Sequence, residues 1–186
     1  VDPIEDWTTT LVPEECSLRG FGYQVIAVDL NGDHIGDLAI ASPDTGQVFI
    51  MLGGEFPKGE VRLDMLPPHR KAVVEGCPTG MAGELSIRTT IERVGDFNGD
   101  GNMDIWYAEM TLGGHKDAVN RILFGDGKGN FSKDMIISRG IDLHDSEIAD
   151  LDGDGDLDIL GKPYDGDAPR LDIWLQNGTG KIITGK

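Results

Sequence analysis

The nine residues 150–158 read Asp-Leu-Asp-Gly-Asp-Gly-Asp-Leu-Asp, with an aspartate at every odd position. Calcium takes about six to eight oxygen ligands, and a short loop supplies them from positions 1, 3, 5, 7 and 9, with position 7 usually offering its backbone carbonyl. Gly153 and Gly155 allow the chain to curl, because glycine adopts positive φ angles without a steric cost. The stretch therefore predicts a calcium-binding loop.

The same spacing occurs at residues 29–37 and 96–104. Ile35, at position 7 of the first of these loops, has only its carbonyl to offer as a ligand. We therefore predict three calcium sites, one for each loop. Their predicted ligands are Asp29, Asn31, Asp33, Ile35 and Asp37; Asp96, Asn98, Asp100, Asn102 and Asp104; and Asp150, Asp152, Asp154, Asp156 and Asp158.

The residues that follow each loop indicate strands. An EF-hand needs a bidentate glutamate at position 12 and a helix leaving the loop. Position 12 is instead Ile40, Tyr107 or Gly161. The exits are short, apolar or aromatic, and bounded by turn residues, which is typical of buried strands. This pattern disfavours both EF-hands and dockerin-type helix pairs, and it favours an all-β chain.

The chain resembles a known repeat family. Phe21-Gly22, the loop at 29–37 and Ala41-Ser42-Pro43 resemble an FG-GAP repeat of integrin α-subunit propellers. The two later loops are more similar to VCBS-type repeats of secreted bacterial proteins, which also carry a glycine-rich turn and an aromatic residue, as at 126–131. One departure is His34 at position 6, where the other loops have glycine. We expect it to strain the first loop and weaken its site.

The resemblance implies an all-β fold of propeller-like blades, each with four antiparallel strands. We predict one repeat domain, residues 1–186, with three repeats. Repeat one is 6–54, an insert is 55–85, repeat two is 86–127, repeat three is 128–178, and a further outer strand begins in 179–186.

Each repeat is expected to open on an outer strand, followed by the two strands that flank the loop and a last strand. The predicted strands are 8–12, 23–29, 38–41 and 47–52; 72–75, 89–94, 104–108 and 120–124; and 131–138, 146–150, 157–160 and 171–175. Within the insert, 61–66 fits either an extra strand or a short helical turn.

Three blades are too few to close a propeller, which typically has about four to eight. Three explanations stay open. The chain is part of a longer propeller, or neighbouring copies complete a ring or fibre, or residues 55–85 hold a degenerate fourth blade. In the second case, the strand at 181–184 would pair with the first blade of another chain.

Composition restricts the choice of partner. The chain has 33 acidic and 16 basic residues, a formal charge of −17. This balance argues against a nucleic-acid partner, which needs clustered lysine and arginine. No apolar run is long enough to predict a membrane span. Cys16 and Cys77 fit one disulfide or two buried thiols equally well. Because extracellular modules work with weak calcium sites, we expect an extracellular or secreted protein, with the periplasm or cell surface as further options.

No catalytic or cofactor-binding residue is predicted, since the four histidines fit no nucleophile or zinc spacing. His144, Lys162, Tyr164 and Arg170 flank the third loop, and similar repeats occur in polysaccharide lyases. We interpret His144 and Tyr164 as packing or turn residues. Trp7, Trp106 and Trp174 are expected in the core rather than on a sugar platform.

Together these observations predict a non-enzymatic, calcium-stabilised extracellular repeat module for adhesion or self-assembly into a ring or fibre. Its expected partners are other copies or neighbouring propeller blades. The alternative is a carbohydrate-binding or polysaccharide-lyase-associated propeller segment.

Overall fold

A computed structural model gives the fold of the protein and describes residues 9–12, 20–42, 46–55, 59–75, 87–111, 118–164, 169–178 and 182–184. The first sheet comprises β2 (Gln24–Val28), β3 (Asp37–Ser42), β4 (Gln47–Met51) and β6 (Lys71–Glu75). The second comprises β7 (Ile87–Gly95), β8 (Asp104–Thr111), β9 (Val119–Phe124) and β10 (Lys133–Arg139). The third comprises β11 (Leu143–Ala149), β12 (Asp158–Pro163), β13 (Asp172–Gln176) and β14 (Ile182–Thr184).

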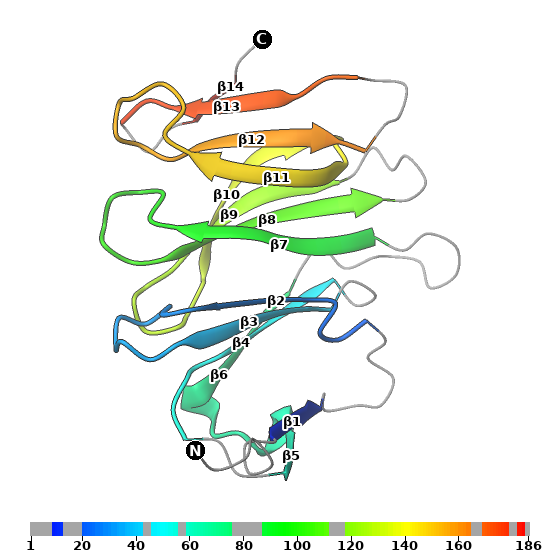
Figure 1. Ribbon diagram of the computed structural model, residues 1–186, viewed down its shortest axis with the longest axis vertical. Coiled ribbons are helices and arrows are strands. Elements are labelled where there is room, and N and C mark those ends of the chain that lie inside the picture. The colour runs from blue at the N-terminus through cyan, green and yellow to red at the C-terminus, as the bar shows by residue number, and fades with distance from the viewer. Residues whose placement is uncertain are drawn as a thin grey trace, which may run out of the picture.

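Each of these three sheets is an antiparallel meander of four strands. The sheets lie one above another, with their first strands along the same edge of the stack (Figure 1). β7 contacts β2 and β3 on one side and β11 on the other. The prediction of an all-β fold with blades of four antiparallel strands is therefore confirmed. Among the described residues, the stack does not close into a ring.

The structure corrects which strand completes each sheet. Residues 71–75 form β6, which pairs with β4 and belongs to the first sheet rather than to the second. Likewise, β10 pairs with β9 and completes the second sheet instead of opening the third. β14 pairs with β13 of its own chain and is the edge strand of the third sheet, and the pairing of 181–184 with another chain stays a prediction. In each case the outer strand extends the ladder of the strand before it.

Two short strands form a separate two-stranded sheet, or ribbon, outside the blades. β1 (Thr9–Val12) pairs in parallel with β5 (Gly59–Arg62), so the prediction that 8–12 is a blade strand is wrong. Residues 61–66, which fitted either a strand or a helical turn, contain both. β5 ends at Arg62, and the 3-10 turn η2 (Leu63–Met65) follows it. The described residues of the insert 55–85 form no fourth blade of their own.

Alternating side chains build the core between the sheets, because successive residues of a strand point to opposite faces. Ala39 and Ala41 of β3 pack with Tyr107 of the second sheet. Trp106 and Ala108 of β8 face the opposite way and pack with the third sheet. The Trp106 indole also donates a hydrogen bond to the Ser146 hydroxyl of β11 at 2.7 Å.

The ribbon and the following turn cover the outer face of the first sheet. Ile40 and Phe49 point away from the second sheet and pack with Val61, Leu63 and Leu66, all of them buried. Residues 59–66 therefore cover this face of the first sheet, and we call them the cap.

Candidate metal centres

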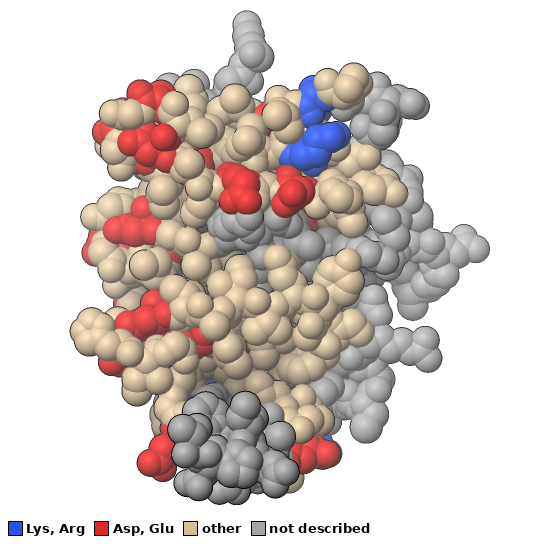
Figure 2. All heavy atoms as spheres, in the orientation of Figure 1, with Lys and Arg blue, Asp and Glu red and all other residues tan. Residues whose placement is uncertain are grey.

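The three aspartate-rich loops connect the first and second strands of each sheet. The first loop (29–37) joins β2 to β3, the second (96–104) joins β7 to β8, and the third (150–158) joins β11 to β12. Acidic side chains gather at the ends of the three sheets where these loops lie (Figure 2). The fold thus places three similar loops along one side of the stack.

The position 1 aspartate organises each loop by accepting backbone hydrogen bonds. Asp29 accepts the N–H groups of Gly32 and His34, both at 2.7 Å. The equivalent bonds join Asp96 to Gly99 and Gly101 at 2.7 and 2.8 Å, and Asp150 to Gly153 and Gly155 at 2.6 and 3.1 Å. Desolvation raises the pKa of the Asp29 carboxyl, but the backbone N–H donors around it outweigh that effect and hold the pKa below its ordinary value.

Positions 3 and 5 form two successive turns in which a side chain accepts the N–H two residues ahead. In the first loop, Asn31 accepts from Asp33 at 3.0 Å, and Asp33 accepts from Ile35 at 2.8 Å. In the second loop, the Asn98 side chain accepts from the N–H of Asp100, and Asp100 accepts from Asn102. In the third loop, Asp152 accepts from Asp154, and Asp154 accepts from Asp156. These four distances are 2.8 to 3.2 Å. The backbone N–H of Asn102 is the main cause of the lowered pKa of Asp100.

The position 9 aspartate is fully buried in all three loops, at Asp37, Asp104 and Asp158. One carboxylate oxygen accepts the N–H of position 2, at 2.7 to 2.9 Å. The other oxygen accepts an N–H at the end of the third strand of the sheet, from Gly53, Gly125 or Gln176, at 2.6 to 2.9 Å. The position 9 aspartate, which is a predicted ligand, therefore also ties each loop to the third strand of its sheet.

Sequence reasoning missed the residues that make this tie possible. A Cβ at Gly53 would lie 2.3 Å from the Gly36 carbonyl oxygen, and one at Gly125 would lie 2.2 Å from the Met103 carbonyl oxygen. In the first two sheets glycine therefore allows the close approach of the two backbones, whereas in the third sheet Gln176 makes the same bond. The available signal was a glycine directly after the third strand of a repeat.

The departure at His34 has the expected conformation. Its φ angle is 68°, and it is the one non-glycine residue with positive φ in the described part of the chain. Gly101 and Gly155 occupy the same position with φ angles of 87° and 96°. The predicted local strain is therefore present in the backbone, whereas its effect on the first site stays a prediction.

The third loop offers the clearest test of whether a metal fits. Oxygens of Asp150, Asp152 and Asp158 lie within 4.8 Å of one another. Desolvation, followed by the charges of Asp154, Asp158 and Asp150, raises the pKa of Asp152. A bound cation would relieve this repulsion. The donors are carboxylates and, in the other loops, amides, and hard divalent cations such as calcium prefer these oxygen ligands. The residues therefore fit a metal of this class.

Comparison with known families now identifies the repeats. The FG-GAP repeat model matches residues 21–51, and the FG-GAP-like repeat model matches residues 94–161. The chain carries FG-GAP and FG-GAP-like repeats. Phe21, which opens the first match, packs edge-to-face on Phe49, with ring centroids 5.5 Å apart.

Two curated relatives resemble nearly all of this FG-GAP repeat chain. The T-cell immunomodulatory protein of Rattus norvegicus is 28% identical over 182 residues, which cover 92% of the chain. The protein of the same name from Mus musculus is 26% identical over 184 residues, or 94% of the chain. The chain spans only about a quarter of the length of each relative, 26% in both cases. No solved structure matches.

The remaining predicted residues do not converge on a catalytic centre within the described part of the FG-GAP repeat chain. His144 stacks on Tyr164, with ring centroids 5.8 Å apart and planes at 16°. Arg170 pairs with Asp172 at 3.1 Å, and Lys162 donates to the Pro163 carbonyl. Trp106 and Trp174 are buried, which confirms that they belong to the core. Trp7, Cys16, Cys77 and His115 lie outside the described residues.

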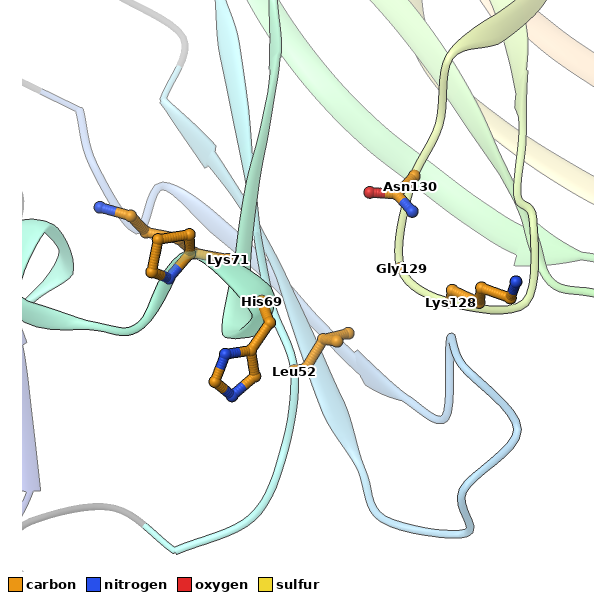
Figure 3. A pocket seen from close by; sticks show the side chains of 7 residues that line it. Leu52, His69, Lys71, Lys128, Gly129 and Asn130 are labelled. Carbon is orange, nitrogen blue, oxygen red and sulfur yellow. The ribbon is translucent and has the colours of Figure 1, made fainter.

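One polar cleft of about 180 Å³ lies between the first and second sheets. In Figure 3, the turn that carries Lys128, Gly129 and Asn130 faces Leu52 and His69. Lys71 also lines the cleft, and its ammonium group donates to the Leu63 carbonyl at 2.9 Å. The cleft thus groups basic side chains in a strongly acidic chain.

The described residues contain no helix that is long and apolar enough to cross a membrane.

Proposed function

We propose that this FG-GAP repeat chain is a calcium-stabilised, extracellular module for adhesion or self-assembly. The observation that carries the proposal is the double role of the position 9 aspartate. It is a predicted oxygen ligand of each loop, and it holds that loop against the third strand of the same sheet. A cation bound there would stabilise a whole blade.

Calcium would be held by the side chains at positions 1, 3, 5 and 9, with position 7 adding its carbonyl. When bound, the ion supplies positive charge and no redox or acid–base chemistry. Three ions would reduce the formal charge of −17 to about −11. Because the loops lie on one side of the stack, this neutralisation would act where the acidic side chains are concentrated.

The proposed role is non-enzymatic, with other copies or neighbouring blades as partners. The relatives are named for T-cell immunomodulation, and a role of that kind is compatible with action outside the cell. Extracellular calcium sites also work at weak affinity, which suits exposed loops of this kind.

Calcium titration calorimetry with thermal unfolding tests the proposal. We expect about three sites, and a higher melting temperature in calcium than in chelator, because the ion binds the folded state. Asp152→Asn combined with Asp154→Asn should remove one site and part of the stabilisation. Glu60→Gln, an exposed acidic position outside the loops, is the matched control and should change neither. Equal melting temperatures with and without calcium would refute the proposal.

The cleft between the first two sheets favours one alternative, the binding of an acidic carbohydrate. Lys128 and His69 both line this cleft, which is large enough for a small anionic group. We would titrate oligouronates into the wild type, Lys128→Ala and the control Lys133→Ala, which changes an exposed lysine of β10. Binding lost only in Lys128→Ala would support this alternative. New ultraviolet absorbance from an unsaturated product would instead indicate a lyase.

A further inference from the structure

A tight turn, residues 125–131, follows the third strand of the second sheet, and we call it the glycine-rich turn. The Asp126 carboxylate accepts the backbone N–H groups of Lys128 and Asn130, at 2.8 and 3.1 Å, and the Asn130 side-chain amide at 2.8 Å. The N–H of Asp126 donates in return to the Asn130 carbonyl at 3.1 Å. These hydrogen bonds make the turn a single compact unit.

The beginning of the glycine-rich turn is fastened to the second loop. The N–H of Gly125 donates to the buried Asp104 carboxylate at 2.9 Å. A Cβ added at Gly127 would overlap the Asn102 side-chain oxygen, so the turn backbone packs directly on that side chain. Asp104 and Asn102 hold positions 9 and 7 of the second loop, and both are predicted calcium ligands. The turn therefore contacts the second site at two points.

The far side of the glycine-rich turn rests on the first sheet. A Cβ added at Gly129 would lie 2.7 Å from a Leu52 methyl group, and Figure 3 shows the Leu52 side chain pointing toward the turn. Phe131 packs on the core cluster between the first and second sheets. Leu52 directly precedes Gly53, whose N–H donates to the Asp37 carboxylate of the first loop at 2.6 Å. The turn thus joins the buried aspartates of the first two loops through a continuous series of contacts.

This connection predicts that binding at one loop helps binding at the other. An ion in the second loop would fix Asp104 and with it the turn, which restricts Leu52 and Gly53. Ordering a loop is part of the free-energy cost of binding, so an ion that enters a loop already ordered binds more tightly. Repulsion between the two ions acts in the opposite direction. Sheets pack about 10 Å apart and physiological salt screens charges beyond about 8 Å, so we expect ordering to dominate.

We propose that the first and second calcium sites bind cooperatively, and that the glycine-rich turn carries the coupling between them. The inference rests on the proposed function and adds regulation to two of its three sites. It also gives the first loop, which has the strained His34, a source of support. The first two sheets would then load and gain stability together over a narrow range of calcium concentration.

Calcium titration calorimetry at physiological salt measures the coupling. The third site is disabled in every protein by Asp152→Asn with Asp154→Asn, so that only the first two sites bind. Asp100→Asn then leaves the first site alone, and Asp33→Asn leaves the second site alone. We define the coupling factor as the overall constant for binding two ions divided by the product of the two single-site constants. The expected factor is about five or more, and it is the same whichever site fills first.

Leu52→Ala tests whether the turn is the route. This change removes the contact with Gly129 and alters no predicted ligand, so the coupling factor should fall to about one. Leu11→Ala is the matched control, because Leu11 is a half-buried leucine of β1 that packs on the outer side of the first sheet. It should leave the factor unchanged. If Leu52→Ala does not fold by circular dichroism, Leu52→Val takes its place and should lower the factor in the same direction.

Two outcomes would overturn the inference. A coupling factor of one or less would make the sites independent or mutually repulsive. A factor that is the same in the Leu52 and Leu11 variants would assign the coupling to other contacts between the sheets. Failure of the proposed function is distinguishable. Ions that stabilise the protein but bind independently refute the coupling alone, whereas a protein that binds no calcium refutes the calcium module and the coupling with it.

Discussion

Replacing His34 by glycine should stabilise the protein, and the structure allows the size of the effect to be worked out. His34 has a φ angle of 68°. The left-handed conformation costs a residue with a Cβ about 1–2 kcal/mol. Glycine loses more conformational freedom on folding than histidine does, which offsets about 0.5–1 kcal/mol of this gain in stability. The expected net gain is therefore about 0.5–1 kcal/mol, or about 1–4 °C in melting temperature for a domain of this size.

Two glycine replacements isolate the effect of the backbone φ angle, because neither added Cβ would clash with a neighbour. A Cβ at either Gly101 or Gly36 would meet nothing within 4 Å, but only Gly101 has a positive φ angle, of 87°. Gly101→Ala should therefore lose about 1 kcal/mol. Gly36→Ala should be neutral or slightly stabilising, because it only restricts the unfolded chain.

Urea unfolding followed by circular dichroism, in chelator, measures all three variants without metal binding. Equal costs for Gly101→Ala and Gly36→Ala would refute the argument, because φ would then not be the cause. A loss of stability in His34→Gly would also refute it. That result would assign a favourable contact to the imidazole, such as its 3.7 Å approach to Asp29.

Three further predictions concern the other loops and the core. Gly125→Ala should cost more than about 2 kcal/mol in urea unfolding, since its Cβ would lie 2.2 Å from the Met103 carbonyl oxygen. Desolvation raises the pKa of Asp104 to about 6 in the calcium-free protein. Asp104 therefore contributes most to the stability of the calcium-free fold below about pH 4. This contribution is lost as the pH rises through about 6. Because calcium needs the carboxylate, calorimetry should show the affinity of the second loop falling about tenfold from pH 7 to pH 5. Trp106→Phe should cost about 1–3 kcal/mol in the same urea assay, because it removes the bond to Ser146 and leaves unfilled volume.

The sequence predicted the loops well because ligand spacing is a local property. Residues 29–37, 96–104 and 150–158 each form the turns that alternating oxygen side chains favour. The hydrogen bond from Gly53 to Asp37 spans 16 residues, and no local pattern specifies it. The second role of the position 9 aspartates therefore emerges only in three dimensions.

The assignment of outer strands failed for a related reason. A loop with this spacing indicates the two strands on either side of it, but it does not show whether the fourth strand of a blade comes before or after. Residues 72–75 and 131–138 both contain strand-like apolar residues, and either could open a repeat or end one. Pairing of β6 with β4 and of β10 with β9 decides the question through backbone hydrogen bonds, which side-chain patterns do not record.

The loop geometry connects metal binding to the packing between sheets. In each loop the backbone N–H of position 2 is held by the buried position 9 carboxylate. At Leu30 and Phe97 the side chain of that same residue enters the core between two sheets. A cation that fixes the carboxylate would therefore also fix the apolar residue that joins one sheet to the next. In the third loop this residue is Leu151, which is 46% exposed, so within the described residues this connection holds for the first two loops.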